Sequence, residues 1–132
     1  MILSVNLNAS MDKAYVVDDF RTGTVTRVKK VISTAGGKGL NVAKVIASLK
    51  QDVIVTGFVG GFTGDFLEQV LTKQKIPYQF THVHGETRTC INIIDKVSNI
   101  HTELLEPGPY VSKKEVEEIF RLYTRLTRRS DV

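Results

Sequence analysis

The sequence predicts an α/β fold in which a parallel sheet packs against helices and carries a smaller β layer at its edge. One observation is that short apolar runs, typical of buried strands, alternate with segments of helical spacing, and this order favours parallel strands joined by helices. The other is that residues 14–34 and 89–105 contain β-branched, partly polar strand pairs that do not fit inside a buried sheet. We therefore expect those pairs to form a separate layer.

The first half of the chain begins with a predicted strand over residues 2–8, where four of the seven side chains are apolar. Residues 14–20 and 25–34 follow as half-exposed strands around a turn. Helical spacing then runs from residue 40 to residue 50. The apolar face predicted for this helix consists of Val42, Val45, Ile46 and Leu49.

The second half begins with the segment VIVTGFV at residues 53–59, an almost continuous apolar run typical of a strand covered on both faces. A second helix follows the segment GGFTGDF and is expected to bury Phe66, Val70 and Leu71. The remaining predicted strands are residues 78–83, 89–95 and 100–105.

A third helix is predicted to begin at Ser112, because Ser112 and Glu115 have the spacing of a capping box and Val111 can pack on Val116. Its apolar face consists of Val116, Ile119, Phe120 and Tyr123. The final residues, Asp131 and Val132, resemble the start of a strand. We therefore expect this sequence to be the N-terminal part of a longer chain.

Composition and charge narrow the functional classes. The net charge is +4, and no segment approaches the roughly 18 to 20 continuous apolar residues of a membrane helix. The first residues lack a basic region followed by a long apolar run, so a signal peptide is not expected. Because Cys90 is the single cysteine, no internal disulfide can form, and we expect a cytoplasmic protein without a membrane partner.

Basic residues gather near the end of the chain, and we interpret them as the solvated face of the third helix. A nucleic-acid surface would have aromatic side chains interleaved with the basic ones. Phe120 and Tyr123 instead fit the apolar face of the helix, so a nucleic-acid partner is not expected. The basic residues are Lys113, Lys114, Arg121, Arg125, Arg128 and Arg129.

The segment TAGGKGLNVAK at residues 34–44 has the glycines and lysine of a phosphate-binding loop. It is not a Walker loop, because Lys38 is followed by Gly39 rather than by a serine or threonine that could bind Mg²⁺. The Rossmann glycine pattern is also missing. What remains is a flexible turn that allows close approach of a ligand to a helix N-terminus, with Asn41 in the first turn. The alternative interpretation is a tight turn into a helix with a solvated Lys38.

Five segments in order carry a more specific signal: LNASMD at residues 7–12, AGGKGLNVAK at 35–44, GFVGGFTGDF at 57–66, GETRTCINI at 85–93 and LLEPGP at 104–109. Together they resemble the ribokinase-like (PfkB) carbohydrate kinases, in the branch of 1-phosphofructokinase and tagatose-6-phosphate kinase. The resemblance covers nearly all 132 residues. It implies a ribokinase-like doubly wound sheet with a small β-sheet lid, whose strands lie near residues 14–34 and 89–105.

The resemblance also implies the roles of individual residues. Asp12 would accept hydrogen bonds from sugar hydroxyls, against the alternative of a helix or turn cap. Lys38 and Arg88 would hold the phosphate that the substrate already carries. Arg27 is a weaker phosphate candidate, with a solvated strand face as its alternative. The residues implied to line the sugar pocket are Gly36, Gly37 and Asn41.

The same resemblance implies ATP and Mg²⁺ as cofactors, a phosphorylated ketohexose as substrate, and a homodimer that forms through the lid. The catalytic base of the family is an aspartate in a Gly-Ala-Gly-Asp segment, which residues 1–132 do not contain. We therefore expect residues 1–132 to be the N-terminal, substrate-binding part of a PfkB-type kinase, without the C-terminal ATP-binding part and inactive alone.

Three functions are compatible with these observations. The first is ATP-dependent phosphorylation of a ketohexose phosphate; GFVGGFTG favours fructose 1-phosphate and TRTCINI favours tagatose 6-phosphate, with a slight preference for the former. The second is a non-catalytic sugar-phosphate binding or regulatory module, and the third is a basic nucleic-acid-binding domain. No metal site is expected, because His82 and His84 share a strand face without a carboxylate or cysteine to complete a ligand set.

Overall fold

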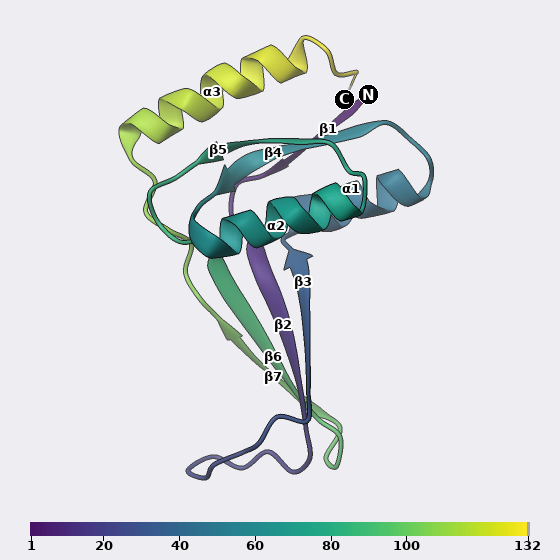
Figure 1. Ribbon diagram of the computed structural model, residues 1–132, viewed down its shortest axis with the longest axis vertical. Helices are drawn as coiled ribbons and strands as arrows, with labels where there is room; N and C mark the ends of the chain where they lie inside the picture. Colours follow the sequence, from purple (N-terminus) through teal and green to yellow (C-terminus); the bar gives the residue numbers. More distant parts are fainter. Residues whose placement is uncertain (132) are drawn as a thin grey trace.

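The computed structural model describes residues 1–131 and contains two sheets (Figure 1). The parallel sheet has the strand order β1-β4-β5, and the second sheet has the order β3-β2-β6-β7 and projects from the first as a long lid. The α/β class and the separate β layer are thus confirmed. The strands are β1 (Ile2–Asn6), β2 (Ser10–Val17), β3 (Lys30–Gly36), β4 (Val53–Val59), β5 (Tyr78–His82), β6 (Arg88–Asp95) and β7 (Ile100–Leu105).

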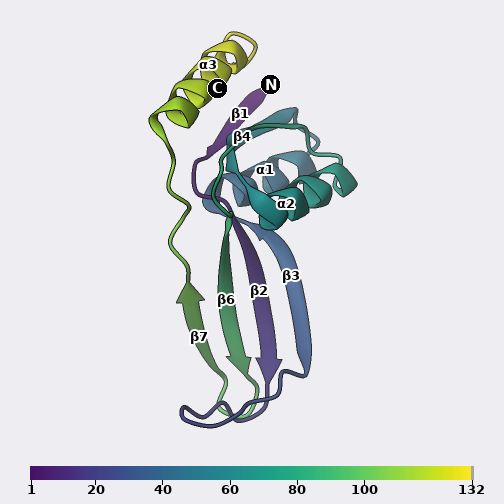
Figure 2. The same ribbon diagram turned by 60° about the vertical axis from the view of Figure 1, so that its left-hand side comes forward.

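Helices cover both faces of the parallel sheet. α1 (Lys38–Ser48) and α2 (Gly61–Lys73) lie on one face, and α3 (Lys113–Thr127) lies on the other (Figures 1 and 2). This is the doubly wound arrangement that the alternation of strands and helices predicts. The core between the sheet and the first two helices includes Leu40, Val55, Val59, Leu67 and Leu71, all fully buried.

Two local predictions are confirmed closely. β4 is buried at every position except Phe58, which is half-buried, as its continuous apolar sequence predicts for a central strand. The N-terminus of α3 is a complete capping box: the Ser112 side chain accepts from the Glu115 backbone N–H, and the Glu115 carboxylate accepts from the Ser112 N–H at 2.6 Å. These reciprocal bonds fix where α3 begins.

The apolar face predicted for α1 is not the face that the helix buries. The buried side chains of this helix are Leu40 and Ala43, whereas three of the four predicted residues are exposed. The cause is the close approach of the glycine turn: a Cβ on Gly39 would lie 2.7 Å from the Val5 carbonyl oxygen, so the helix meets β1 along its small residues. The exposed side chains are Val42, Val45 and Leu49.

The apolar face of α3 is only partly covered. Ile119 is buried, but the rest of the predicted face lines an apolar groove of about 330 Å³ between α3 and the sheet. Among residues 1–131, no helix combines the length and apolar character that crossing a bilayer requires. The groove is lined by Val5, Leu7, Thr56, Phe58, Val116, Ile119, Phe120 and Tyr123.

The lid strands differ from the predicted boundaries in an informative way. β2 begins at Ser10, so Asp12 lies inside the lid sheet rather than in a loop after β1. β3 begins only at Lys30, and residues 18–29 form the irregular tip of the lid. Asp95 organises part of this tip, because its buried carboxylate accepts backbone N–H groups from both sides of it. The donors are Asp19, Phe20, Val97 and Ser98.

Replacing Asp95 with asparagine is expected to destabilise the lid tip in a pH-dependent way. Burial acts to raise the pKa of Asp95, but hydrogen bonds from Ser98, Phe20 and Val97 together hold that pKa far below its usual range. The folded pKa is thus below the unfolded value of about 4, so the carboxylate stabilises the fold above pH 4 and loses this effect as the pH falls further. Urea unfolding of both proteins should show a gap at pH 7 that narrows toward pH 2; a constant gap would contradict the assignment.

Candidate functional site

A cavity of about 410 Å³ lies where the lid meets the N-terminus of α1, at the carboxyl ends of the parallel strands. Open α/β sheets bind their ligands at this edge. Its walls come from four lid strands and one helix, so one cavity joins segments that are distant in sequence. The polar and thiol side chains of its lining belong to Ser10, Asp12, Lys13, Thr34, Lys38, Asn41, Arg88, Cys90, Asn92 and Glu103.

Strand register explains why the predicted residues meet. Ser10 pairs with Arg88 across β2 and β6, and Asp12 pairs with Cys90. Alternate residues of a strand share a face, so Asp12, Arg88 and Cys90 all face the cavity. Two residues that are 76 positions apart in the sequence, Asp12 and Arg88, are therefore held by one ladder of backbone hydrogen bonds.

The Asp12 carboxylate is held in place by its neighbours. The Ser10 hydroxyl donates to Asp12 Oδ1 at 2.6 Å, which fixes the rotamer. A Cβ on Gly36, which lies next to Asp12 on β3, would overlap with the carboxylate. Gly36 therefore provides the space that the carboxylate occupies, and at least one oxygen stays available to accept a hydroxyl donor.

The turn before α1 supplies the donor-rich end of the cavity. Gly37 has φ 112°, and a Cβ there would lie 2.5 Å from Asn6 Nδ2, so this position requires glycine. α1 then begins at Lys38, and within the described chain no side chain caps its first N–H groups. The positive end of the helix dipole, Lys38 and the Asn41 amide therefore all point at one region.

Arg88 adds a second cation to this region. Its Nη1 and Nη2 donate to the carbonyl oxygens of Glu106 and Asn8 at 3.5 and 3.3 Å, which are long hydrogen bonds. Its buried Nε has no partner, and no carboxylate pairs with the guanidinium, among residues 1–131. A guanidinium with spare donors and no counter-charge suits an anion with several oxygens, such as a phosphate.

Residues 4–124 match the family model described as "pfkB family carbohydrate kinase". The chain belongs to the pfkB family of carbohydrate kinases. The resemblance inferred from its five segments is thus confirmed. Five of the seven residues assigned to substrate binding line the cavity of this pfkB chain, and a sixth, Gly36, lies directly beside it against Asp12.

Individual relatives narrow the branch of the pfkB family. The chain is 42% identical to a protein named tagatose-6-phosphate kinase from Staphylococcus epidermidis, over 100% of this chain and 42% of the relative. It is 34% identical to a solved structure named a possible 1-phosphofructokinase from Thermotoga maritima, with a TM-score of 0.90 over 99% of this chain and 42% of that one. The chain therefore spans about 42% of the length of these relatives.

A third comparison supports the fold alone. The crystal structure of phosphofructokinase-2 from Escherichia coli in complex with fructose-6-phosphate has a TM-score of 0.89 with 22% identity, and the match covers 94% of this chain and 41% of that one. The ribokinase-like fold of the pfkB chain, a parallel sheet with a β lid, is thus confirmed.

Arg27 is the one assigned residue that the fold does not bring to the cavity. The pair Asp12–Thr34 lies at the base of the lid, whereas Lys30 pairs with Val16 four residues further along. Four strand residues span roughly 13 Å, and Arg27 lies beyond them in the lid tip. Arg27 as a phosphate ligand of this pfkB chain stays a prediction, and its own subunit does not deliver it to Asp12.

Sequence reasoning missed several residues that line the cavity, and it also missed Lys44, which lies beside the glycine turn but does not line the cavity. Lys44 follows Asn41 by three positions on α1, and its Nζ donates to the Ala35 carbonyl beside the glycine turn. Burial lowers the pKa of Lys44, an effect that the charge of Asp12 partly opposes. Helical spacing from Asn41 would have placed Lys44 on this side. Asn92 and Glu103 were missed because strand pairing, which sequence does not show, brings them to the cavity.

The residues before Arg88 tie the lid to α2. Thr87 Oγ1 accepts from the Gly60 N–H at 2.8 Å, and the Glu86 carboxylate accepts from the Thr63 N–H at 2.6 Å. The N-cap residue of α2, Gly60, has no side chain that could accept a hydrogen bond. The Glu86 carboxylate, which is distant in sequence, caps the helix instead. The backbone N–H and hydroxyl of Thr63 hold the pKa of Glu86 below its usual range. These bonds fix the position from which Arg88 enters the cavity.

Replacing Glu86 with alanine is expected to destabilise the fold by about 1 kcal/mol, the usual effect of losing a helix cap. Glutamine should lose less, because its amide oxygen can still accept from Thr63. Urea unfolding at pH 7 measures both changes, with Glu118→Ala as the control since Glu118 lies inside α3 and caps no helix. Equal stability of the alanine variant and wild type would exclude the capping role.

Proposed function

We propose that residues 1–132 form the acceptor-substrate part of an ATP-dependent kinase that phosphorylates a ketohexose phosphate to the bisphosphate. The observation that carries the proposal is the meeting of Asp12, the free N-terminus of α1 and Arg88 in one cavity. The cavity has an acceptor for hydroxyls and three cationic side chains, of which Lys38 and Arg88 lie toward the α1 N-terminus and the base of the lid, which matches a sugar monophosphate. A non-catalytic sugar-phosphate binding module is the second candidate, since the same cavity would serve it.

In this proposal, the residues bind and orient the acceptor sugar. Lys38 and Arg88 hold its phosphate, and Arg88 can do so with two parallel hydrogen bonds. Asp12, fixed by Ser10, accepts from a sugar hydroxyl. Phosphoryl transfer depends mainly on positioning and on electrostatic stabilisation, so a sugar held at both ends lowers the barrier through orientation.

ATP with Mg²⁺ supplies the transferred phosphoryl group in this reaction, but the cavity described above does not fit it. Lys38 is followed by Gly39, so no hydroxyl is available for Mg²⁺, and Asp12 and Glu103 would repel a triphosphate. Residues 1–132 also lack a Gly-Ala-Gly-Asp segment. The proposal therefore places ATP and the catalytic base in the remainder of the whole protein. Cys90, a free thiol, supports a reducing compartment such as the cytoplasm.

A coupled assay that measures ADP release tests the proposed reaction. The whole protein, with ATP, Mg²⁺ and tagatose 6-phosphate or fructose 1-phosphate, should turn over, and residues 1–132 alone should not. Sugar-phosphate binding by the whole protein without any turnover would favour the non-catalytic module. Turnover by residues 1–132 alone would contradict the proposed division of the site.

The relatives support two different sugar phosphates as the substrate. The 42% identical relative is named for tagatose 6-phosphate, and the 34% identical structure is named for 1-phosphofructokinase. Comparison of kcat/KM for both sugars in the whole protein decides between them.

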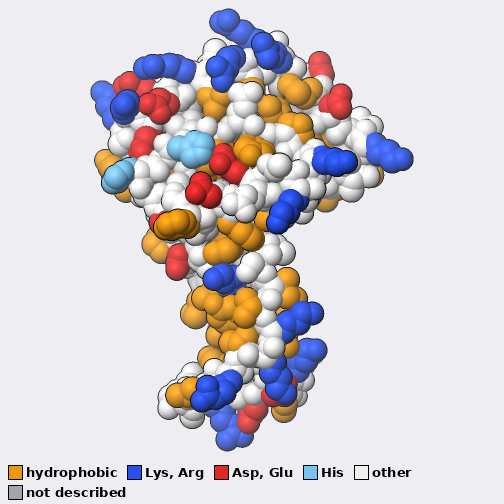
Figure 3. Space-filling model, viewed as in Figure 1, with side chains coloured by type: hydrophobic (Ala, Val, Ile, Leu, Met, Phe, Trp, Pro, Cys, Tyr) orange, Lys and Arg blue, Asp and Glu red, His pale blue; other side chains and the backbone are white. Residues whose placement is uncertain are grey.

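We further propose that two subunits pair through their lids. The lid strands expose large apolar side chains, among them Val31, Ile100 and Leu104, and Figure 3 shows hydrophobic side chains gathered along the lid. A second lid packed here would cover them and could bring Arg27 of one subunit to the cavity of the other. Sedimentation of the whole protein should give a dimer, and Val31→Glu with Leu104→Glu should give a monomer.

A further inference from the structure

We propose that Asn92 and Glu103 form a wall of the cavity that accepts hydrogen bonds from substrate hydroxyls. This wall selects uncharged, hydroxyl-bearing groups on the side of the substrate that faces the lid. The inference rests on the proposed function, a kinase of ketohexose phosphates, and gives roles to two residues to which the sequence assigned none: Asn92, inside the segment GETRTCINI, and Glu103, outside the five segments. Both residues lie on the cavity face of the lid, beyond Asp12 as seen from the helices.

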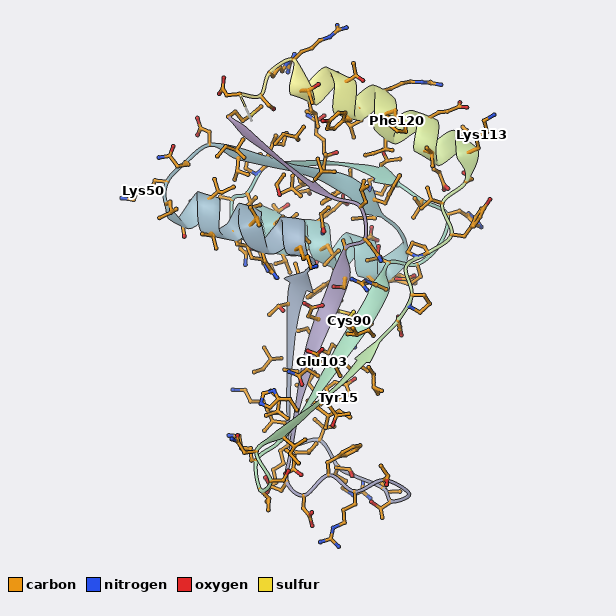
Figure 4. All side chains as sticks on the ribbon, turned by 180° about the vertical axis from the view of Figure 1, so that it is seen from behind. Tyr15, Lys50, Cys90, Glu103, Lys113 and Phe120 are labelled. Carbon is orange, nitrogen blue, oxygen red and sulfur yellow. The ribbon has the colours of Figure 1, made fainter. Side chains whose placement is uncertain are left out.

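Strand register places the two side chains beside each other. Asn92 on β6 pairs with Ala14 on β2 and with Glu103 on β7, one cavity-facing position further along the lid than the pair of Asp12 with Cys90. Figure 4 shows the same order, with Cys90 close to the helical layer and Glu103 further along the lid. Both line the cavity that contains Asp12 and Arg88.

Asn92 has an unused acceptor. Its Nδ2 lies 3.3 Å from His101 Nδ1, whereas its Oδ1 is buried and has no partner among residues 1–131. A buried amide oxygen without a partner costs free energy, and a bound hydroxyl that donates to it removes that cost. With the His101 proton on Nε2, its Nδ1 accepts from the Asn92 Nδ2, and Oδ1 is then the atom that is left for a ligand.

Glu103 supplies a second acceptor with a negative charge. Its carboxylate forms no ion pair within the described chain, so it is available to a ligand. Lys38 and Arg88 attract a phosphate at one end of the cavity, and Asp12, Asn92 and Glu103 accept hydroxyl donors on the lid side, where Lys13 is the one cation of the described lining. A carboxylate repels an anionic group, so Glu103 opposes a second phosphate or a sugar acid at its side of the cavity.

Calorimetric binding to the whole protein tests the wall, with tagatose 6-phosphate, fructose 1-phosphate and their monodeoxy analogues as probes. Glu103→Gln is expected to weaken the preferred sugar phosphate by about tenfold, the usual effect of losing one charge-assisted hydrogen bond. Asn92→Leu should weaken it by about fivefold. Glu118→Gln, which removes an exposed carboxylate from α3, is the control and should bind as wild type. Melting temperatures of all variants confirm that they are folded.

The deoxy analogues separate direct contact from a structural role. If Glu103 accepts a hydrogen bond from one substrate hydroxyl, the analogue that lacks this hydroxyl cannot form the bond. Wild type and Glu103→Gln should then bind that analogue with equal affinity. An equal loss on every analogue, or no loss on any, would overturn the proposal for Glu103. If the wild-type protein binds no ketohexose phosphate at all, the proposed function fails as well, which is a different result from selective failure of the variant.

Discussion

Replacing Gly36 with alanine is expected to weaken ketohexose-phosphate binding by about a hundredfold, the equivalent of losing two hydrogen bonds to a charged group, while the fold remains nearly as stable as wild type. The new Cβ would overlap with the Asp12 carboxylate. That carboxylate is the far end of a flexible side chain, so it can rotate away and relieve the overlap. The rotation breaks its hydrogen bond from Ser10 and removes the acceptor from the cavity.

The matched control is Gly23→Ala. Gly23 lies at the lid tip with φ 75°, and nothing lies within 4 Å of the position where its Cβ would be. This substitution should cost about 1 kcal/mol of backbone strain and leave binding unchanged. Calorimetry and thermal melting of the two variants in the whole protein measure both effects. Normal binding by Gly36→Ala would show that the Asp12 position is not used by the substrate.

The sequence identified the residues around Gly36 but not which face of α1 is buried. Motif segments identified Asp12, Arg88 and the glycine turn, because close approach and charge leave a direct trace in residue type. The rotation of α1 left no such trace, since the helix has apolar side chains on two faces and the glycine turn decides which face meets β1. Helical spacing placed Val42, Val45 and Leu49 on one apolar face, and the structure leaves these three side chains exposed.

The lid shows the same limit for the site. Asn92 and Glu103 look like ordinary polar residues of half-exposed strands, and only the pairing of β6 with both β2 and β7 brings them to Asp12. Arg27 differs in the opposite direction: its residue type suits phosphate, but β3 begins at Lys30, later than predicted, so Arg27 lies in the lid tip and its role stays a prediction. Residue type indicates chemistry, whereas register decides which residues share a site.

Replacing Arg88 with methionine is expected to reduce affinity for a ketohexose phosphate by about a hundredfold, because a charge-assisted, two-point contact with the phosphate is lost. Affinity for the unphosphorylated sugar should change little, since Asp12 and the turn before α1 remain. Lysine should give an intermediate loss, because it keeps the charge but not the planar fork. The structural cost should be small, as the two hydrogen bonds of Arg88 within the chain are long.

Binding of tagatose 6-phosphate and of free tagatose to the whole protein distinguishes the two possible roles of Arg88. A loss confined to the phosphorylated sugar assigns Arg88 to the phosphate. The control is Arg121→Met, which removes an exposed arginine of α3 whose Nη2 lies 3.7 Å from Glu117 Oε2. This control should leave both affinities at the wild-type value. An equal loss for both sugars would instead mean that Arg88 acts by supporting the carbonyls of Asn8 and Glu106 at the base of the lid. In that case the phosphate would depend on Lys38 and the α1 N-terminus alone, and Lys38→Met would become the variant with the larger effect.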